Sequence, residues 1–390
     1  MRFVPFILPL VRFVAASPAS QVPLLRHAGT DRSVSEALYS DLEELARIVD
    51  ISYCVGLAGT GIAKPFKCLS RCSDFPDFEL IRTWNTGQLM SDSCGYIALS
   101  HSTLNPRIIV AFRGTYSIAN TVVDLSTIPQ EYAPYPGEPD ADEEGDAQRC
   151  NNCTVHTGFY SSWNVTSSTI IPHIEAAKTV HPNYQLTLVG HSLGGAVAAL
   201  AGLEFVSRGW DPIVTTFGEP RLGNKALMEY IDERFKLPTN STTDSDSIEK
   251  RDFEKNLHYR RVTHIDDPVP LLPLSEWGYR MHAGEIYITK PALSPDVSDL
   301  KHCSGDEDPT CIAGQDASLS ALSSTDGIDL KETVAKAEMA DRAGIKNWGL
   351  PARYHLWQLF FAHRDYFWRL GLCVPGGDPW DWGREKYGVV

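Results

Sequence analysis

Residues 184–206 of this 390-residue chain read YQLTLVGHSLGGAVAALAGLEFV. The first six residues predict a buried strand, and the small and apolar residues from Leu193 onward predict a helix. Between them, Gly190-His-Ser192-Leu-Gly194 has the Gly-x-Ser-x-Gly pattern that raises a serine on a sharp strand-to-helix turn. A tight turn without chemistry is the alternative, but the flanking strand and helix favour Ser192 as a nucleophile.

Outward from this turn, strand candidates alternate with helix candidates. The strands are expected at residues 96–100, 107–112, 213–217, 260–265 and 285–289, and helices at 34–53 and 165–180. Such alternation predicts an α/β-hydrolase fold, with a mostly parallel central sheet and helices on both faces. Residues 21–390 are expected to form one domain. Two polar, turn-rich stretches, 238–255 and 304–330, are predicted to be loop insertions, the second leading to a short helix at 330–339.

The composition and the N-terminus predict an exported protein. The net charge of −14 argues against nucleic-acid binding. Residues 1–20 resemble a signal peptide with an apolar core, although Arg12 and two prolines leave a short anchor as an alternative. No later stretch is apolar enough to span a membrane. Glycosylation acceptors at Asn152, Asn164 and Asn240 also favour secretion.

The nine cysteines fit an oxidising compartment, and an odd number leaves one thiol over. Three pairs are close in sequence: Cys68 with Cys72, Cys150 with Cys153, and Cys303 with Cys311. Cys150-x-x-Cys153-x-x-His156 also has the spacing of half a zinc site. Because no second ligand pair accompanies it and a glycosylation sequon lies inside it, no metal is expected.

A serine nucleophile needs an oriented base, and in this fold the chain order is serine, acid, histidine. Asp266 and Asp267 both follow the strand expected at 260–265, so either can be the acid. His355 and His363 both come late enough in the chain to be the base. Spacing within the fold leaves these alternatives open.

Six segments together resemble the fungal class 3 lipase family, which includes triacylglycerol lipases and feruloyl esterases. They occur in the family's order and extend the resemblance over roughly residues 35–375. They are residues 112–115 (FRGT), 155–159 (VHTGF), 190–194 (GHSLG), 217–224 (FGEPRLGN), 263–270 (THIDDPVP) and 362–367 (AHRDYF).

The resemblance implies a role for each matching residue. The family's acid falls on Asp267, with Asp266 in a neighbouring polar position, and the family's His-x-x-Tyr-Phe motif falls on His363. Thr115, by its amide and hydroxyl, and the amide of Leu193 are implied as oxyanion donors, with Asp124 holding the Thr115 hydroxyl. His355 lacks the Tyr-Phe offset, which favours a packing role.

The resemblance also implies disulfide pairings. Cys373 follows His363 by ten residues, as a family half-cystine does, and is expected to pair with Cys54. The likeness supports Cys68 with Cys72 and Cys150 with Cys153 as well. Cys303 is paired with Cys311 on proximity alone, which leaves Cys94 as the odd thiol.

Residues 116–123 match the family's lid, where Ser117, Ile118, Val122 and Val123 are candidate lid residues. Ile118 and Val122 would share one apolar face of a short helix with Leu125. Thr121 replaces a Trp common in the lipases. The implied enzyme is a monomeric, cofactor-independent triacylglycerol lipase that acts at a lipid–water interface. A feruloyl or small-ester esterase, and an inactive cell-surface binding protein, remain as alternatives.

Overall fold

The computed structural model describes residues 32–56, 61–87, 93–115, 129–135, 150–238, 247–315, 362–375 and 378–379. Several expectations fall outside these ranges. They are the signal peptide at 1–20, the lid residues Ser117, Ile118, Val122 and Val123 with Asp124, the acceptor Asn240, the alternative base His355, and the helix expected at 330–339.

A large sheet forms the centre of the protein, with strands in the order β1-β2-β3-β6-β7-β9-β11-β12. The five strands from β3 to β11 run parallel, while β1, β2 and β12 are antiparallel to their neighbours. The bounds are Phe78–Asn85 (β1), Cys94–Ser100 (β2), Arg107–Phe112 (β3), Gln185–His191 (β6), Ile213–Phe217 (β7), Tyr259–His264 (β9), Glu285–Ile288 (β11) and Leu300–His302 (β12).

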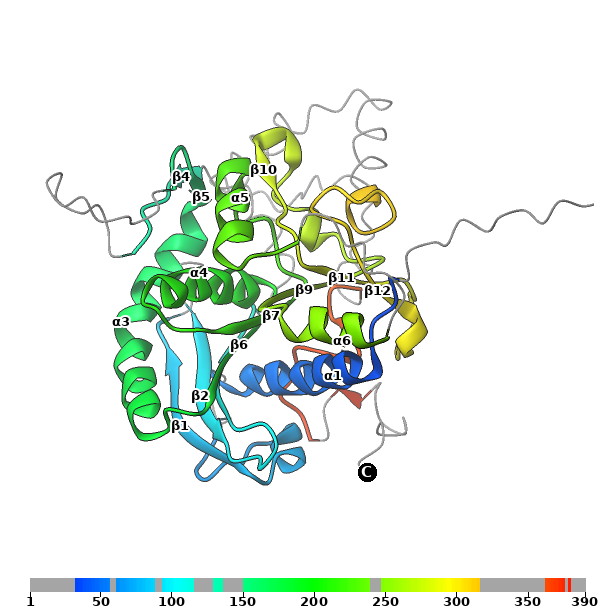
Figure 1. The fold of residues 1–390 in the computed structure, drawn as a ribbon. Helices are drawn as coiled ribbons and strands as arrows, with labels where there is room; N and C mark the ends of the chain where they lie inside the picture. The colour runs from blue at the N-terminus through cyan, green and yellow to red at the C-terminus, as the bar shows by residue number, and fades with distance from the viewer. Residues whose placement is uncertain are drawn as a thin grey trace, which may run out of the picture.

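Helices cover both faces of this sheet (Figure 1). One face packs against α1 (Glu36–Ile51), and the other against α3 (Thr157–Val180) and α4 (Leu193–Ser207). A hydrophobic core lies on each face of the sheet, and alternate residues of β3 point into the two cores. Val110 faces α3 and α4, and Ile109 faces α1. The predicted α/β-hydrolase architecture is therefore confirmed.

The remaining elements lie outside the central sheet and the three helices that cover it. Helix α5 spans Lys225–Arg234. A four-stranded sheet joins β10 (Tyr279–Arg280), β8 (Gly223–Asn224), β5 (Thr154–His156) and β4 (Pro129–Glu131), and a hairpin joins β13 (Asp365–Tyr366) to β14 (Trp368–Arg369). Short 3-10 turns are η1 (Ser52–Cys54), η2 (Arg71–Asp74), η3 (Val269–Leu271), η4 (Ser275–Trp277) and η5 (Val297–Asp299). Among the helices within the described ranges, none is long and apolar enough to cross a membrane.

The prediction of a loop throughout residues 238–255 is wrong for its second half, which forms helix α6 (Ser247–Lys255). This segment contains several good helix formers, and a buried contact holds it to the body of the protein. Glu254 Oε1 accepts a hydrogen bond from the backbone N–H of Ser35 (2.9 Å) and lies 3.1 Å from His302 Nε2. The segment is so polar that its sequence alone did not indicate a helix attached to the body of the protein.

The start of α3 also differs from the sequence prediction, because the helix begins at Thr157 rather than Val165. Gly158 and the serines that follow it are poor helix formers, so propensity alone delays the predicted start. The side chain of His156 caps the helix by accepting from the Phe159 N–H, and Phe159 and Trp163 are buried. Burial and capping therefore outweigh propensity here.

Four disulfides join eight of the nine cysteines: Cys54–Cys373, Cys68–Cys72, Cys150–Cys153 and Cys303–Cys311. Cys94 remains a buried thiol, with its Sγ 3.0 Å from Asn85 Oδ1. The Cys54–Cys373 bond spans 319 positions and joins the end of η1 to the segment that follows His363. It therefore connects the N-terminal and C-terminal parts of the domain.

Removing Cys54–Cys373 by a double Cys→Ser substitution should destabilise the protein more than removing Cys68–Cys72, which are four positions apart. The chain-entropy estimate is about 5–6 kcal/mol for the long loop and about 2 kcal/mol for the short one. Urea unfolding monitored by circular dichroism measures both losses. Equal losses in the two variants would show that the long loop adds no constraint.

Candidate active site

Ser192 occupies a sharp turn between β6 and α4. Its backbone has φ 58° and ψ −130°, a strained conformation for a residue with a side chain, and the Ser192 N–H donates to Phe217 O (2.9 Å). Close packing across the turn requires glycine: a Cβ on Gly190 would lie 2.2 Å from Gly194 O, and one on Gly194 would lie 2.3 Å from Phe112 O. This is the geometry expected for a serine raised at the carboxyl edge of a sheet.

Asp267 and His363 meet at the same edge of the sheet, and neither side chain is exposed to solvent. His363 Nδ1 lies 2.9 Å from Asp267 Oδ2 and 3.0 Å from Asp267 Oδ1. Asp267 follows β9, whereas His363 belongs to the segment just before β13. Asp266, the alternative acid, is exposed, and its backbone N–H points to His264 Nδ1 (3.4 Å). Of the two aspartates, only Asp267 contacts His363 within the described residues.

Three donors surround the Asp267 carboxylate. Besides His363 Nδ1, the Tyr366 hydroxyl donates to Oδ2 and the Val269 N–H donates to Oδ1 (2.9 Å). Burial by itself would raise the pKa of Asp267, but the interaction with His363 and these hydrogen bonds outweigh it and lower the pKa below its usual value. Asp267 is therefore a carboxylate at neutral pH.

The carboxylate determines which nitrogen of His363 carries the proton. Because Asp267 can only accept, Nδ1 of His363 donates, and in the neutral ring Nε2 has a free lone pair. Nε2 is buried and has no hydrogen-bond partner among the described residues. The His363 ring stacks on that of His191, the residue before Ser192, with centroids 4.8 Å apart. The dyad thus offers a base next to the serine turn.

Gly218 makes room for this dyad. It follows β7 with φ +59°, and a Cβ there would lie 2.8 Å from both Asp267 Oδ2 and His363 Cε1. A side chain at this position would therefore be strained and would push the acid and the base apart. Neither Gly218 nor Tyr366 received a role from the sequence. Tyr366 was part of the His-x-x-Tyr-Phe motif, and its fixed spacing from His363 was the available signal.

The two candidate oxyanion donors belong to two segments that adjoin Ser192. Leu193 is the first residue of α4, where a backbone N–H has no acceptor within the helix. Thr115 is half-buried and follows β3, which pairs in parallel with β6 so that Phe112 is opposite Gly190. A Cβ on the adjacent Gly114 would lie 2.8 Å from Ser192 Cβ, so this segment passes within contact distance of the nucleophile turn.

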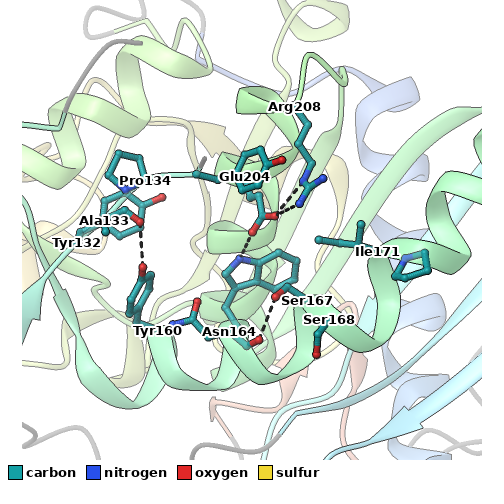
Figure 2. A pocket seen from close by; sticks show the side chains of 13 residues that line it. Tyr132, Ala133, Pro134, Tyr160, Asn164, Ser167, Ser168, Ile171, Glu204 and Arg208 are labelled. Carbon is teal, nitrogen blue, oxygen red and sulfur yellow. Dashed lines mark hydrogen bonds and ion pairs between the residues drawn. The ribbon is translucent and has the colours of Figure 1, made fainter. Parts of the chain in front are cut away.

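A separate cavity of about 450 Å³ lies between α3, α4 and the segment after β4 (Figure 2). Glu204 lies in its wall, accepting from Trp163 Nε1 (2.8 Å) and from Arg208 (2.7 Å), and the Tyr160 hydroxyl donates to Ala133 O (2.9 Å). Ser192, Asp267 and His363 do not line this cavity. These polar groups of the wall are hydrogen-bonded within the protein, and the cavity is distinct from the serine site.

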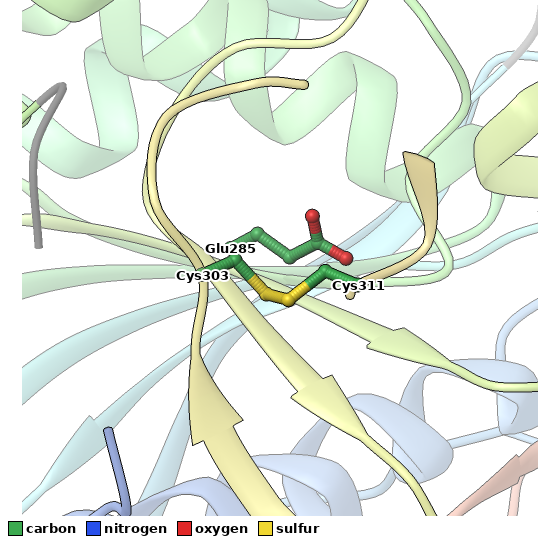
Figure 3. A group of neighbouring side chains, drawn as sticks. All are labelled: Glu285, Cys303 and Cys311. Atoms are coloured by element: carbon green, nitrogen blue, oxygen red, sulfur yellow. A yellow bond between two sulfur atoms is a disulfide. The ribbon is translucent and has the colours of Figure 1, made fainter. Parts of the chain in front are cut away.

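Cysteine groupings offer no thiolate ligands for a metal. Within the described residues, Glu285, Cys303 and Cys311 have ligand atoms close enough to share an ion, but the two sulfurs form a disulfide (Figure 3). Cys150 and Cys153 are joined in the same way, and His156 Nδ1 accepts the Phe159 N–H. The sequence pattern that resembled half a zinc site is thus a disulfide beside a helix cap.

Asn152 and Asn164, the two glycosylation acceptors that lie in the described ranges, are exposed. Asn152 lies in the turn between Cys150 and Cys153, and Asn164 lies on α3. Attachment of glycans at these positions remains a prediction.

Comparisons with known proteins match this chain to lipases. The family described as Lipase (class 3) matches residues 109–277. A protein of Gibberella zeae named secreted mono- and diacylglycerol lipase 2 is 52% identical, covering 92% of this chain and 88% of the relative. Lipase A of Sodiomyces alcalophilus is 49% identical, covering 96% of this chain and 92% of the relative.

A solved structure extends the likeness to three dimensions. The Lip2 lipase of Yarrowia lipolytica aligns with a TM-score of 0.67 at 28% identity, over 88% of this chain and 97% of that protein. The protein is secreted, as the expected signal peptide indicates: the Gibberella zeae relative is named as a secreted lipase, and four disulfides fit an oxidising compartment. High identity over nearly the whole length shows that the chain belongs to the fungal class 3 lipase family and is a carboxylester hydrolase.

Proposed function

We propose that the protein hydrolyses acylglycerols through an acyl-enzyme formed on Ser192, with His363 as general base and Asp267 as its orienting acid. The observation that carries this proposal is the buried Asp267–His363 pair beside the serine turn, in which His363 Nε2 has no hydrogen-bond partner among the described residues. A neutral imidazole with a free Nε2 can take the serine proton as the hydroxyl attacks the ester carbonyl.

The same residues account for both halves of the reaction. His363 takes the proton of Ser192 and returns it to the departing glycerol alkoxide, which leaves the acyl group bonded to the serine. Water then attacks the acyl-enzyme, with His363 again accepting and returning a proton. The amides of Leu193 and Thr115 and the Thr115 hydroxyl stabilise the oxyanion of each tetrahedral intermediate, and Asp124 orients that hydroxyl.

Mono- and diacylglycerols are the proposed substrates, together with the triacylglycerols that the motifs suggest. Support comes from the relative of Gibberella zeae, which is named for mono- and diacylglycerols. Residues 116–123 are proposed as a lid that opens when Ile118 and Val122 contact a lipid surface. Adsorption of apolar side chains favours an open state, with roughly 1.5–3 kcal/mol for each side chain that leaves water.

Ser192→Ala and His363→Ala should each lower kcat by roughly 10,000-fold or more, because the members of a triad act as a unit. His355→Ala serves as the matched control and should retain most of the activity. Hydrolysis of a soluble short-chain ester measures the rates, and circular dichroism checks folding. An inactive His355→Ala beside an active His363→Ala would move the base to His355.

Asp267→Asn should lower kcat by roughly 1,000- to 10,000-fold, because an amide can hold the wrong His363 tautomer. Asp266→Asn changes an exposed neighbour and should alter kcat only a few-fold. Steady-state kinetics on the same ester compare the two variants. Equal losses in both folded proteins would contradict the assignment of Asp267.

The lid proposal is tested by following the rate as an ester passes its solubility limit. The rate should rise steeply at that limit for an emulsified diacylglycerol or short triacylglycerol. A double Ile118→Ser and Val122→Ser variant should lose the rise and keep its rate on dissolved esters, because only adsorption depends on those side chains. Simple saturation through the limit in both proteins would favour a soluble-ester esterase instead.

A further inference from the structure

His191, the residue before the nucleophile, is buried, and both of its ring nitrogens have partners. Nε2 lies 2.8 Å from the backbone carbonyl oxygen of His363, and Nδ1 lies 2.6 Å from the hydroxyl of Tyr53. Because a carbonyl oxygen only accepts, Nε2 carries the hydrogen and Nδ1 accepts from the Tyr53 hydroxyl. His191 therefore holds the main chain of the candidate base from the serine strand.

Tyr53 extends this connection to the oxyanion segment, by which we mean residues 114–115 with the candidate oxyanion donor Thr115. A Cβ on Gly114, the residue before Thr115, would lie 2.5 Å from the Tyr53 hydroxyl oxygen, so Tyr53 packs directly against this segment. Tyr53 also precedes Cys54, whose disulfide to Cys373 secures the chain that follows His363. Tyr53 thus contacts Gly114, and hydrogen bonds continue from Tyr53 through His191 to the His363 carbonyl.

The groups around His191 keep this pattern constant with pH. Burial is the main cause that lowers the pKa of His191 to about 3, and the nearby charge of His363 adds to it. Arg364 also lowers the pKa, whereas Asp267 raises it. The aromatic rings that face it belong to Tyr53, His363 and Tyr366. His191 is therefore neutral at neutral pH and keeps one donor and one acceptor.

We propose that His191, held by Tyr53, is a positioning residue that keeps His363 and the oxyanion segment in register with Ser192. The inference rests on the proposed function, since it concerns the geometry of the same triad. His191 transfers no proton in the reaction. Without it, the His363 carbonyl loses its ring donor, and the stacked His363 ring loses the surface that fixes its distance from the serine.

His191→Leu removes both hydrogen bonds, and Tyr53→Phe removes only the hydroxyl. Each variant should lower kcat on a soluble short-chain ester by about 10- to 100-fold with KM within about two-fold, because orientation changes the chemical step more than binding. The acid limb of the kcat/KM profile should move to lower pH, because a displaced His363 has less support from Asp267 for its protonated form. His191→Gln provides an amide N–H for the His363 carbonyl and should recover about ten-fold over His191→Leu.

His101→Leu is the matched control. His101 Nδ1 also contacts a tyrosine hydroxyl, that of Tyr184 at 2.8 Å, but this pair is exposed. It lies just after Ser100, which pairs with Arg107 at the end of β3 remote from Gly114. This variant should keep the parental kcat and the parental acid limb.

The outcomes separate the two proposals. Parental kcat and acid limb in folded His191→Leu, with Ser192→Ala inactive, would overturn the positioning role alone. Full activity of Ser192→Ala would overturn the proposed function itself. If His191→Leu fails to fold, Tyr53→Phe decides: a reduced kcat with a shifted acid limb supports the role, and parental values overturn it.

Discussion

The hydrogen bond between Asp267 and His363 is the interaction on which the site depends. Both side chains are buried, so water does not compete for the hydrogen bonds of the carboxylate. The protein donors therefore fix its position. The bond selects the tautomer of His363 and leaves Nε2 directed away from the acid. Gly218 is required because any larger residue would occupy the space where the two side chains meet.

The sheet explains how distant segments supply one site. β3, β6, β7 and β9 run parallel, so the residues that follow their carboxyl ends, Thr115, Ser192, Gly218 and Asp267, lie at one edge. His363 arrives from the C-terminal segment, which the Cys54–Cys373 bond and the carbonyl contact with His191 hold in place. The strain at Ser192 is maintained by this surrounding framework.

Much of the fold and of the candidate site could be predicted from the sequence, because short local patterns indicate them. The strands at 107–112 and 213–217 were predicted to the residue, since both segments are rich in the β-branched and aromatic residues that favour strands. The full length of α3 and the helix α6 were missed because their stability comes from capping and tertiary contacts. The link between Tyr53 and His191 spans 138 positions, so no local pattern could have revealed it. Tyr366 was visible in a motif, but its contact with Asp267 required the fold.

Activation of Ser192 by His363 is tested most directly by peptide mapping after reaction with a fluorophosphonate, which bonds to an activated serine. A single adduct is expected on the peptide that contains Ser192, formed rapidly in the parent protein and very slowly in the His363→Ala variant. The reason is that only a serine whose proton is taken by a neighbouring base reacts quickly. An adduct on another serine would show that Ser192 is not the nucleophile, and equal labelling with and without His363 would show that His363 is not its base.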